Sequence, residues 1–188
     1  MNFLGHFYLS KNDSDLIVGN FIADFVKGNK FMDYPKKISD GILMHREIDH
    51  YTDRHQMVRR GRKRLFGTFR HYSGVIIDMY YDHYLARLWN NYSKEPLDFF
   101  ADNIYKTIET HWGLLPEKSR YMFPYMKHGN WLVRYASTEG IDLSLNGMSR
   151  RLNNNSGLEQ ATHHLRRYYD DFEEEFKIFI SEIKERFA

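Results

Sequence analysis

The stretch PKKISDGILMHREIDHYTDRH, residues 35–55, decides the fold of this 188-residue chain. Its Pro35 suits the first turn of a helix, where the amide hydrogen that proline lacks would be unpaired in any case. After it, apolar side chains and then imidazole and carboxylate side chains recur every three or four residues, the spacing of one helix face. These residues are Ile38, Ile42, His45, Asp49 and Asp53. The stretch therefore predicts a helix to about His55 whose polar groups continue an apolar stripe.

Comparable spacing elsewhere predicts further helices. Asp13 can cap the first of them, and Gly28 is a suitable stop after it. The predicted ranges are 13–27, 57–69, 74–91, 96–112, 116–127, a broken segment over 130–152, and one long amphipathic helix over 157–187. Alternating strand patterns are almost absent, and no repeat of roughly 20 to 50 residues is evident. We therefore predict an all-α fold, an irregular helical bundle that forms a single domain over residues 1–188.

The composition narrows the kind of site and of partner. The chain has no cysteine and a formal net charge of +2, so any metal must bind His, carboxylate and water. So small a charge, without a recognised nucleic-acid-binding motif, gives no support for a nucleic-acid partner. The N-terminal segment lacks the basic start of a signal peptide, and no apolar run approaches the roughly 20 residues of a membrane helix. We expect a cytoplasmic protein with no membrane partner, and the oligomeric state stays open.

His and Asp side chains lie among apolar neighbours on three of the predicted helices. Burying a carboxylate is costly unless it is paired or bound to a cation, and one shared metal would offset that cost for several of them together. Residues at i and i+4 project from the same face of a helix, so His45 with Asp49, and Asp78 with Asp82, can each bind one ion in tandem. The candidate metal ligands are His6, Asp24, His45, Asp49, Asp78 and Asp82.

The donor types indicate which metal would bind. Imidazole and carboxylate groups without sulfur favour Mn²⁺, Fe²⁺ or Mg²⁺ over a structural zinc ion. His83 follows Asp82 by about 100° around the helix axis. It can therefore reach the same centre from the side or serve as a base beside it.

Plainer interpretations of these residues stay open. Asp24 can be an ordinary helix residue, His6 a core histidine, and His45 with Asp49 part of a surface ion-pair network. Their joint pattern favours a metal site more than any single member does. The motifs GxSxG, GxxxxGK[ST] and GxGxxG do not occur. Their absence argues against serine hydrolases, P-loop proteins and dinucleotide-binding proteins, and a metal hydrolase remains.

A basic segment follows the deciding helix. No Asp or Glu occurs from Arg54 to Ile77. Its central cations are Arg59, Arg60, Arg62, Lys63 and Arg64. Such a segment is either a solvated helix or a docking surface for an acidic partner.

In several motifs, in order along nearly the whole chain, the sequence resembles the acyl carrier protein phosphodiesterases. The motifs are MNFL at 1–4 with His6, GNFIADFVKG at 19–28, His45-Arg46 with Ile48-Asp49, Asp78, Asp82-His83, WLVRY at 131–135 and NGM at 146–148. The resemblance implies a helical fold related to the HD phosphohydrolases, dependence on Mn²⁺, and cleavage of 4′-phosphopantetheine from the serine of holo acyl carrier protein. The metal-site residues it implies are His6, Asp24, His45, Asp49, Asp82 and His83.

Under this hypothesis two further residues take part in catalysis. Arg46 would neutralise phosphate charge beside the metal, and His83 or a carboxylate would orient the attacking water. Acyl carrier proteins are acidic, so the basic segment would dock them. Two alternatives remain: an HD-like phosphohydrolase acting on a nucleotide or small phosphoester, and a helical binding module without catalysis.

Overall fold

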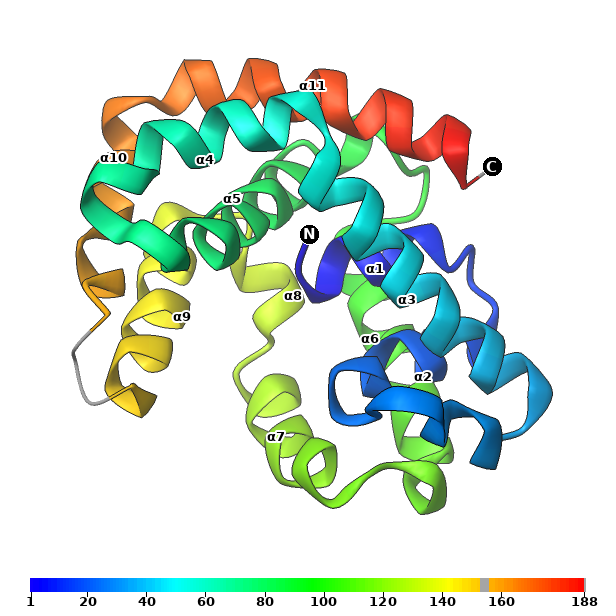
Figure 1. Cartoon of the computed structure of the whole chain (residues 1–188). Coiled ribbons are helices and arrows are strands. Elements are labelled where there is room, and N and C mark those ends of the chain that lie inside the picture. Colours follow the sequence, from blue (N-terminus) through cyan, green and yellow to red (C-terminus); the bar gives the residue numbers. More distant parts are fainter. Residues whose placement is uncertain (153–155, 188) are drawn as a thin grey trace.

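The computed structural model describes residues 1–152 and 156–187, and in them it contains helices and no strand (Figure 1). The all-α prediction is confirmed. The α-helices are α1 Phe3–Leu9, α2 Ser14–Ile22, α3 Lys36–Arg54, α4 Gln56–Phe69, α5 Ser73–Arg87, α6 Leu97–Thr110, α7 Glu117–His128, α8 Trp131–Arg134, α9 Thr138–Arg151, α10 Ala161–Arg167 and α11 Tyr169–Arg186. Short 3₁₀ turns join several of them, including η1 Ala23–Phe25 and η2 Gly28–Asp33.

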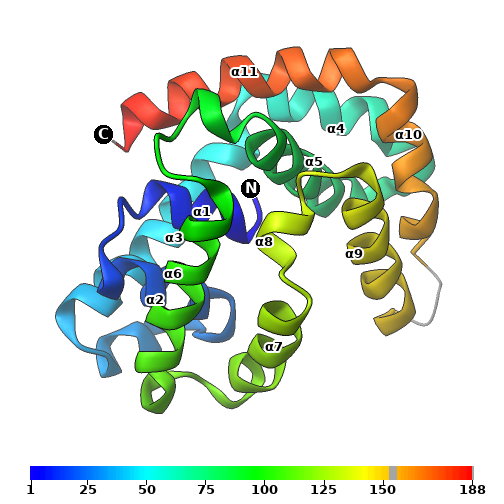
Figure 2. The same ribbon diagram turned by 180° about the vertical axis from the view of Figure 1, so that it is seen from behind.

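Helix α5 lies at the centre of the molecule. Eleven of its 15 residues are buried, which places it between α1, α4, α9 and α11. Helices α4 and α11 run side by side over it, and α1 lies against it from the other direction (Figures 1 and 2). In the described part of the chain, no helix combines the length and the apolar composition that crossing a bilayer would need.

The close packing of α2 on α3 determines where the candidate site can form. A Cβ atom at Gly19 would lie 2.3 Å from the backbone oxygen of Ile38 and 2.7 Å from Cα of Gly41, so only glycine permits this approach. The two backbones therefore touch, and α2 is held against the first two turns of α3. Asp24 follows α2 directly, in η1.

Two predicted helix boundaries are wrong. The helix predicted to Lys27 ends at Ile22. The carbonyls of Val26 and Gly28 accept hydrogen bonds from Arg46 Nη2, at 2.8 and 3.0 Å, which holds the chain in turns at this point. Hydrogen bonds from the Arg46 side chain thus take the place of the backbone hydrogen bonds that the predicted helix would have made here.

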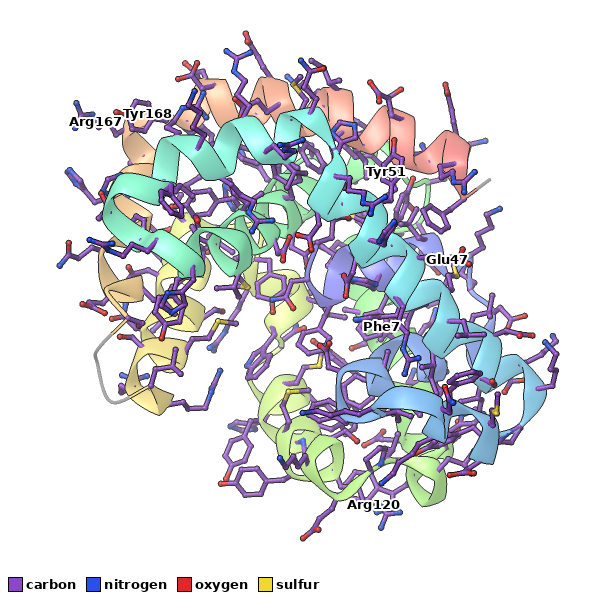
Figure 3. The ribbon with its side chains drawn as sticks, in the orientation of Figure 1. Phe7, Glu47, Tyr51, Arg120, Arg167 and Tyr168 are labelled. Carbon is purple, nitrogen blue, oxygen red and sulfur yellow. The ribbon has the colours of Figure 1, made fainter. Side chains whose placement is uncertain are left out.

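The single helix predicted over 157–187 is broken at Tyr168, where φ and ψ are −120° and 33°. Figure 3 shows Tyr168 at the turn between α10 and α11. The hydroxyl of Tyr84 donates to the carbonyl of Tyr169 at 2.7 Å. This partly buried contact with α5 fixes the start of α11 and redirects the chain.

Candidate metal centre

Four of the predicted ligands form one group at a single cleft. His6 comes from α1, Asp24 from η1, and His45 and Asp49 from α3. The Asp49 carboxylate bridges the two imidazoles: its Oδ1 lies 3.2 Å from His6 Nε2, and its Oδ2 lies 3.2 Å from His45 Nε2. Asp24 Oδ1 lies 3.4 Å from the same nitrogen of His45. One ligand atom each from His6, His45 and Asp49 lie within 4.8 Å of one another.

The cleft around this group has a volume of about 250 Å³. Both histidines are buried, whereas the Asp24 and Asp49 side chains are 64% and 48% exposed, so the carboxylates face the entrance. The lining residues are Met1, Asn2, Phe3, His6, Asp24, His45, Asp49, Thr52, Asp53, Val75 and Asp78. The site can therefore admit a substrate on the side of its carboxylates.

A hydrogen-bond chain orients His6. Asn20 Nδ2 donates to Ser10 Oγ at 2.9 Å and to the carbonyl of Leu16 at 3.3 Å, so its Oδ1 is turned toward His6 Nδ1, 3.1 Å away. An acceptor at that distance keeps the proton of a neutral imidazole on Nδ1 and leaves a lone pair on Nε2. That lone pair faces two oxygens, Asp49 Oδ1 and the carbonyl of Met1, each at 3.2 Å. A cation between these atoms would remove the repulsion.

The charges of the group are strongly coupled. Burial lowers the pKa of His45, but hydrogen bonds to Asp24 and Asp49 outweigh this effect and raise it to about 9. Burial would raise the pKa of Asp49, but the hydrogen bond from His45 and the positive charge of that imidazole hold it well below its usual range. Burial and the charge of His45 lower the pKa of His6. The metal-free group is thus one positive imidazole, one neutral imidazole and two carboxylates.

This donor set fits a divalent cation. Two imidazole nitrogens and one or two carboxylates form an N/O site with room for water or substrate, which is typical of Mn²⁺ and Fe²⁺. The His6 and His45 rings stack with their centroids 4.0 Å apart, so both edges point into the same space. His45 Nδ1 is buried and has no hydrogen-bond partner among the described residues. His6, in contrast, is held from behind by Asn20.

Asp82 is not brought to this group. It is fully buried on α5, and its carboxylate accepts hydrogen bonds from the backbone amides of Asn2, Leu4 and Gly5 at 3.1, 2.8 and 3.1 Å. Burial raises the pKa of Asp82 to about 7, and the amide donors act in the opposite direction. Its place in the predicted ligand set is corrected accordingly: it anchors the helix that carries His6.

His83 and Arg46 also lie away from the cleft. Nδ1 of His83 contacts the carbonyl of Tyr135 at 2.7 Å and its Nε2 the hydroxyl of Tyr169 at 2.5 Å, because one residue after Asp82 the helix has turned toward α8 and α11. Arg46 binds the turn that follows Asp24 and lies over the ring of Phe31. Neither residue lines the cleft, so the structure does not bring them to the His–Asp group.

Asp78 lines the cleft but stands outside the His–Asp group. Its Oδ1 accepts a hydrogen bond from the amine of Met1 at 2.9 Å. Asn20 was missed by the sequence analysis, although it stands in the GNFIAD motif, where a lone amide among apolar residues signals a buried hydrogen bond.

The basic segment divides between two faces of α4. Arg60 and Arg64 pair with the buried Glu175 of α11, at 3.1 and 2.9 Å. Arg62 pairs with Asp53 at 2.8 Å. The open groove on the other face, about 490 Å³ in volume, is lined by Asp53, Arg59, Arg62, Lys63, Phe66, Gly67, Arg70, His71 and Ser73. Because Asp53 lines both spaces, this basic groove adjoins the cleft.

Comparison with known proteins agrees with the sequence resemblance. The family model described as acyl carrier protein phosphodiesterase matches residues 1–183. The chain belongs to this family. An acyl carrier protein phosphodiesterase of Photorhabdus laumondii is 33% identical over 190 residues, which cover 99% of this chain and 94% of the relative. One of Salmonella agona is 33% identical over 177 residues, 94% of this chain and 92% of the relative. No solved structure matches, so a relation to the HD phosphohydrolases stays a prediction.

The geometry of this family member predicts that Asp49 is required for metal binding. The Asp49→Asn variant should bind Mn²⁺ at least tenfold more weakly, because the carboxylate charge shared by both imidazoles is lost. Isothermal titration calorimetry with Mn²⁺ measures the change. Asp40→Asn is the matched control, since Asp40 lies on the same helix and pairs with Lys36 at the surface. Equal affinities of the two variants would exclude the proposed ligand group.

Metal affinity should also depend on pH. His45 is protonated in the metal-free protein up to about pH 9, and a cation must displace this proton to bind its Nε2. The apparent association constant for Mn²⁺ should therefore rise with pH, by up to about tenfold per unit between pH 6.5 and 8.5. Titrations in buffers of different ionisation enthalpy would detect the released proton. A flat profile over this range would show that His45 is not a ligand.

Proposed function

We propose that this protein hydrolyses the phosphodiester that links 4′-phosphopantetheine to the serine of holo acyl carrier protein, using Mn²⁺ held by His6, His45 and Asp49. One observation carries the proposal: a single carboxylate bridges two buried imidazoles at an open cleft, in a chain whose family is named for this activity. The proposal thus names Mn²⁺ as the cation, the holo carrier as the substrate and the apo carrier as the product.

The residues of the cleft suit such a reaction. A bound divalent cation supplies a water of lowered pKa and withdraws charge from the phosphoryl oxygens. Asp24, the more exposed carboxylate of the group, would orient the attacking water and accept its proton. The water oxygen bonds to phosphorus while the bond from phosphorus to the serine oxygen breaks, and the serine oxygen takes up a proton. The products are the apo carrier and free 4′-phosphopantetheine.

The carrier itself would dock on the basic groove beside the cleft. Arg59 and Lys63 are exposed there, and Arg62 continues the groove toward Asp53. Positive charge next to the site favours an acidic partner through complementary potential. Arg60 and Arg64 do not line this groove, and both pair with Glu175 instead.

The reaction is tested directly by incubating the protein with Mn²⁺ and holo acyl carrier protein and weighing the carrier by mass spectrometry. The carrier should lose the mass of 4′-phosphopantetheine, and a chelator should abolish the loss. Asp49→Asn should lower kcat/KM at least a hundredfold, whereas Asp40→Asn should leave it within twofold. An unchanged carrier, with a nucleotide or small diester hydrolysed instead, would favour the alternative phosphohydrolase function.

Docking on the basic groove predicts a charge-dependent KM. The double variant Arg59→Glu/Lys63→Glu should raise KM for the holo carrier about tenfold at low salt. The increase should shrink at high salt, because the Debye length falls to about 3 Å at 1 M. The control Lys106→Glu/Lys118→Glu makes the same charge change on α6 and α7. If both double variants raise KM equally, only net charge matters and the docking surface is wrong.

A further inference from the structure

One exposed aromatic side chain lies in the basic groove. Phe66 of α4 is 60% exposed, and the groove that it lines also contains the cations Arg59, Lys63 and Arg70. A single apolar side chain at a protein surface needs no special explanation. Phe66 differs because it lies among positive charges that favour an acidic partner. Its ring is therefore placed to contact the same partner as the cations.

The spacing along α4 puts Phe66 in line with these cations. Residues three, four and seven apart lie close to one face of a helix. Lys63 and Arg59 precede Phe66 by one and two turns, and Arg70 follows it by one turn, directly after the end of α4. At 1.5 Å per residue the row spans about 16 Å. It matches a partner surface on which acidic side chains lie on both sides of an apolar one.

The surface beside the Phe66 ring is open. Gly67 also lines the groove, and a Cβ atom there would have no described atom beyond its own stretch of helix within 4 Å. Glycine inside a helix destabilises it relative to alanine, and close packing does not require glycine here. Gly61 of the same helix differs, because its Cβ would lie 2.7 Å from Ile77 Cδ1. A partner side chain can therefore lie against the exposed side of the ring.

Arg70 is held in a backbone conformation that favours glycine. Its φ is 48° and its ψ is −122°, and a side chain in this region is strained. The residue begins η3, Arg70–Tyr72, which joins α4 to α5. A glycine would fit this backbone with less strain but would remove a cation from the groove. The arginine thus lowers stability at a position where its charge borders the Phe66 surface.

We infer that Phe66 is the apolar anchor of the docking surface. Its ring contacts an exposed apolar side chain of the carrier, while Arg59, Lys63 and Arg70 pair with carboxylates on either side. The inference rests on the proposed function for the identity of the partner. Specific interfaces have an apolar centre rich in aromatic side chains, surrounded by a polar rim, and the row on α4 has this composition. The cations orient the encounter, and Phe66 supplies affinity that salt does not screen.

The test measures the affinity for apo carrier by isothermal titration calorimetry, because this product contains no phosphodiester and its binding does not depend on hydrolysis. Phe66→Ala should weaken binding about tenfold, since burial of the ring is lost, and by the same factor at low and at high salt. Phe66→Leu should keep most of the affinity. Phe99→Ala is the matched control, since Phe99 is 56% exposed on α6 and does not line the groove.

Two further variants separate docking from folding. Gly67→Gln should weaken binding of apo carrier severalfold, because its side chain fills the space beside the ring, while thermal stability rises since glycine is the poorer helix former. Arg70→Gly should also weaken binding, with a loss that shrinks at high salt, and should not lower the melting temperature. A lower melting temperature in both variants, with unchanged binding, would assign these residues to the fold and overturn the inference.

These measurements distinguish the anchor from the proposed function. If carriers are hydrolysed and Phe66→Ala binds apo carrier as tightly as Phe99→Ala does, the anchor is wrong and the function stands. If no carrier is hydrolysed but binding depends on Phe66, the function fails and the anchor stands.

Sedimentation velocity and titration with a single-stranded oligonucleotide test two other occupants of the groove. Self-association that Phe66→Ala abolishes, with carrier binding unchanged, would assign the ring to a second copy of this chain. Oligonucleotide binding that Phe66→Ala abolishes, again with carrier binding unchanged, would assign it to a base stacked on the ring. Either result would overturn the inference.

Discussion

The buried carboxylate of Asp82 holds the candidate site together. Three amides at the start of α1 donate to it, and hydrogen bonds are electrostatically stronger in the protein interior than in water. Helix α1 has only seven residues, too few to be stable without tertiary contacts. Since His6 lies on this helix, its distance from α3 depends on a residue that does not touch the cleft.

Two further contacts position the segments that carry Asp24, His45 and Asp49. The glycine contact between α2 and α3 holds α2 against the first turns of α3, and Arg46 of α3 fixes the turn after Asp24 by binding two of its carbonyls. The four polar side chains thus come from three separate segments, each positioned by its own contact. A group assembled in this way is rigid before any ligand arrives, which lowers the cost of binding a cation.

The sequence predicted the helical segments and the half of the site that lies within one helix. His45 and Asp49 share a face because residues four apart always do, and the structure brings them together with His6 and Asp24. The same rule failed for Asp82, since periodicity shows that a side chain faces the interior but not which partner it meets there. Asp82 accepts hydrogen bonds from backbone amides of α1, and no sequence pattern indicates such a partner. The positions of His83 and Arg46 could not be predicted either, because carbonyl acceptors leave no trace in side-chain spacing.

The division of charge on α4 follows from helix geometry and from one buried acid. Arg60 and Arg64 are four residues apart and face α11, where Glu175 would otherwise be an unpaired buried charge. Arg59 and Lys63 are also four residues apart, about 100° away around the axis, and face the groove beside the cleft. A basic run that looks uniform in sequence therefore contains one pair that stabilises the fold and another that is free to meet a partner. Glu175, the buried acid on α11, determines which of the two pairs stabilises the fold.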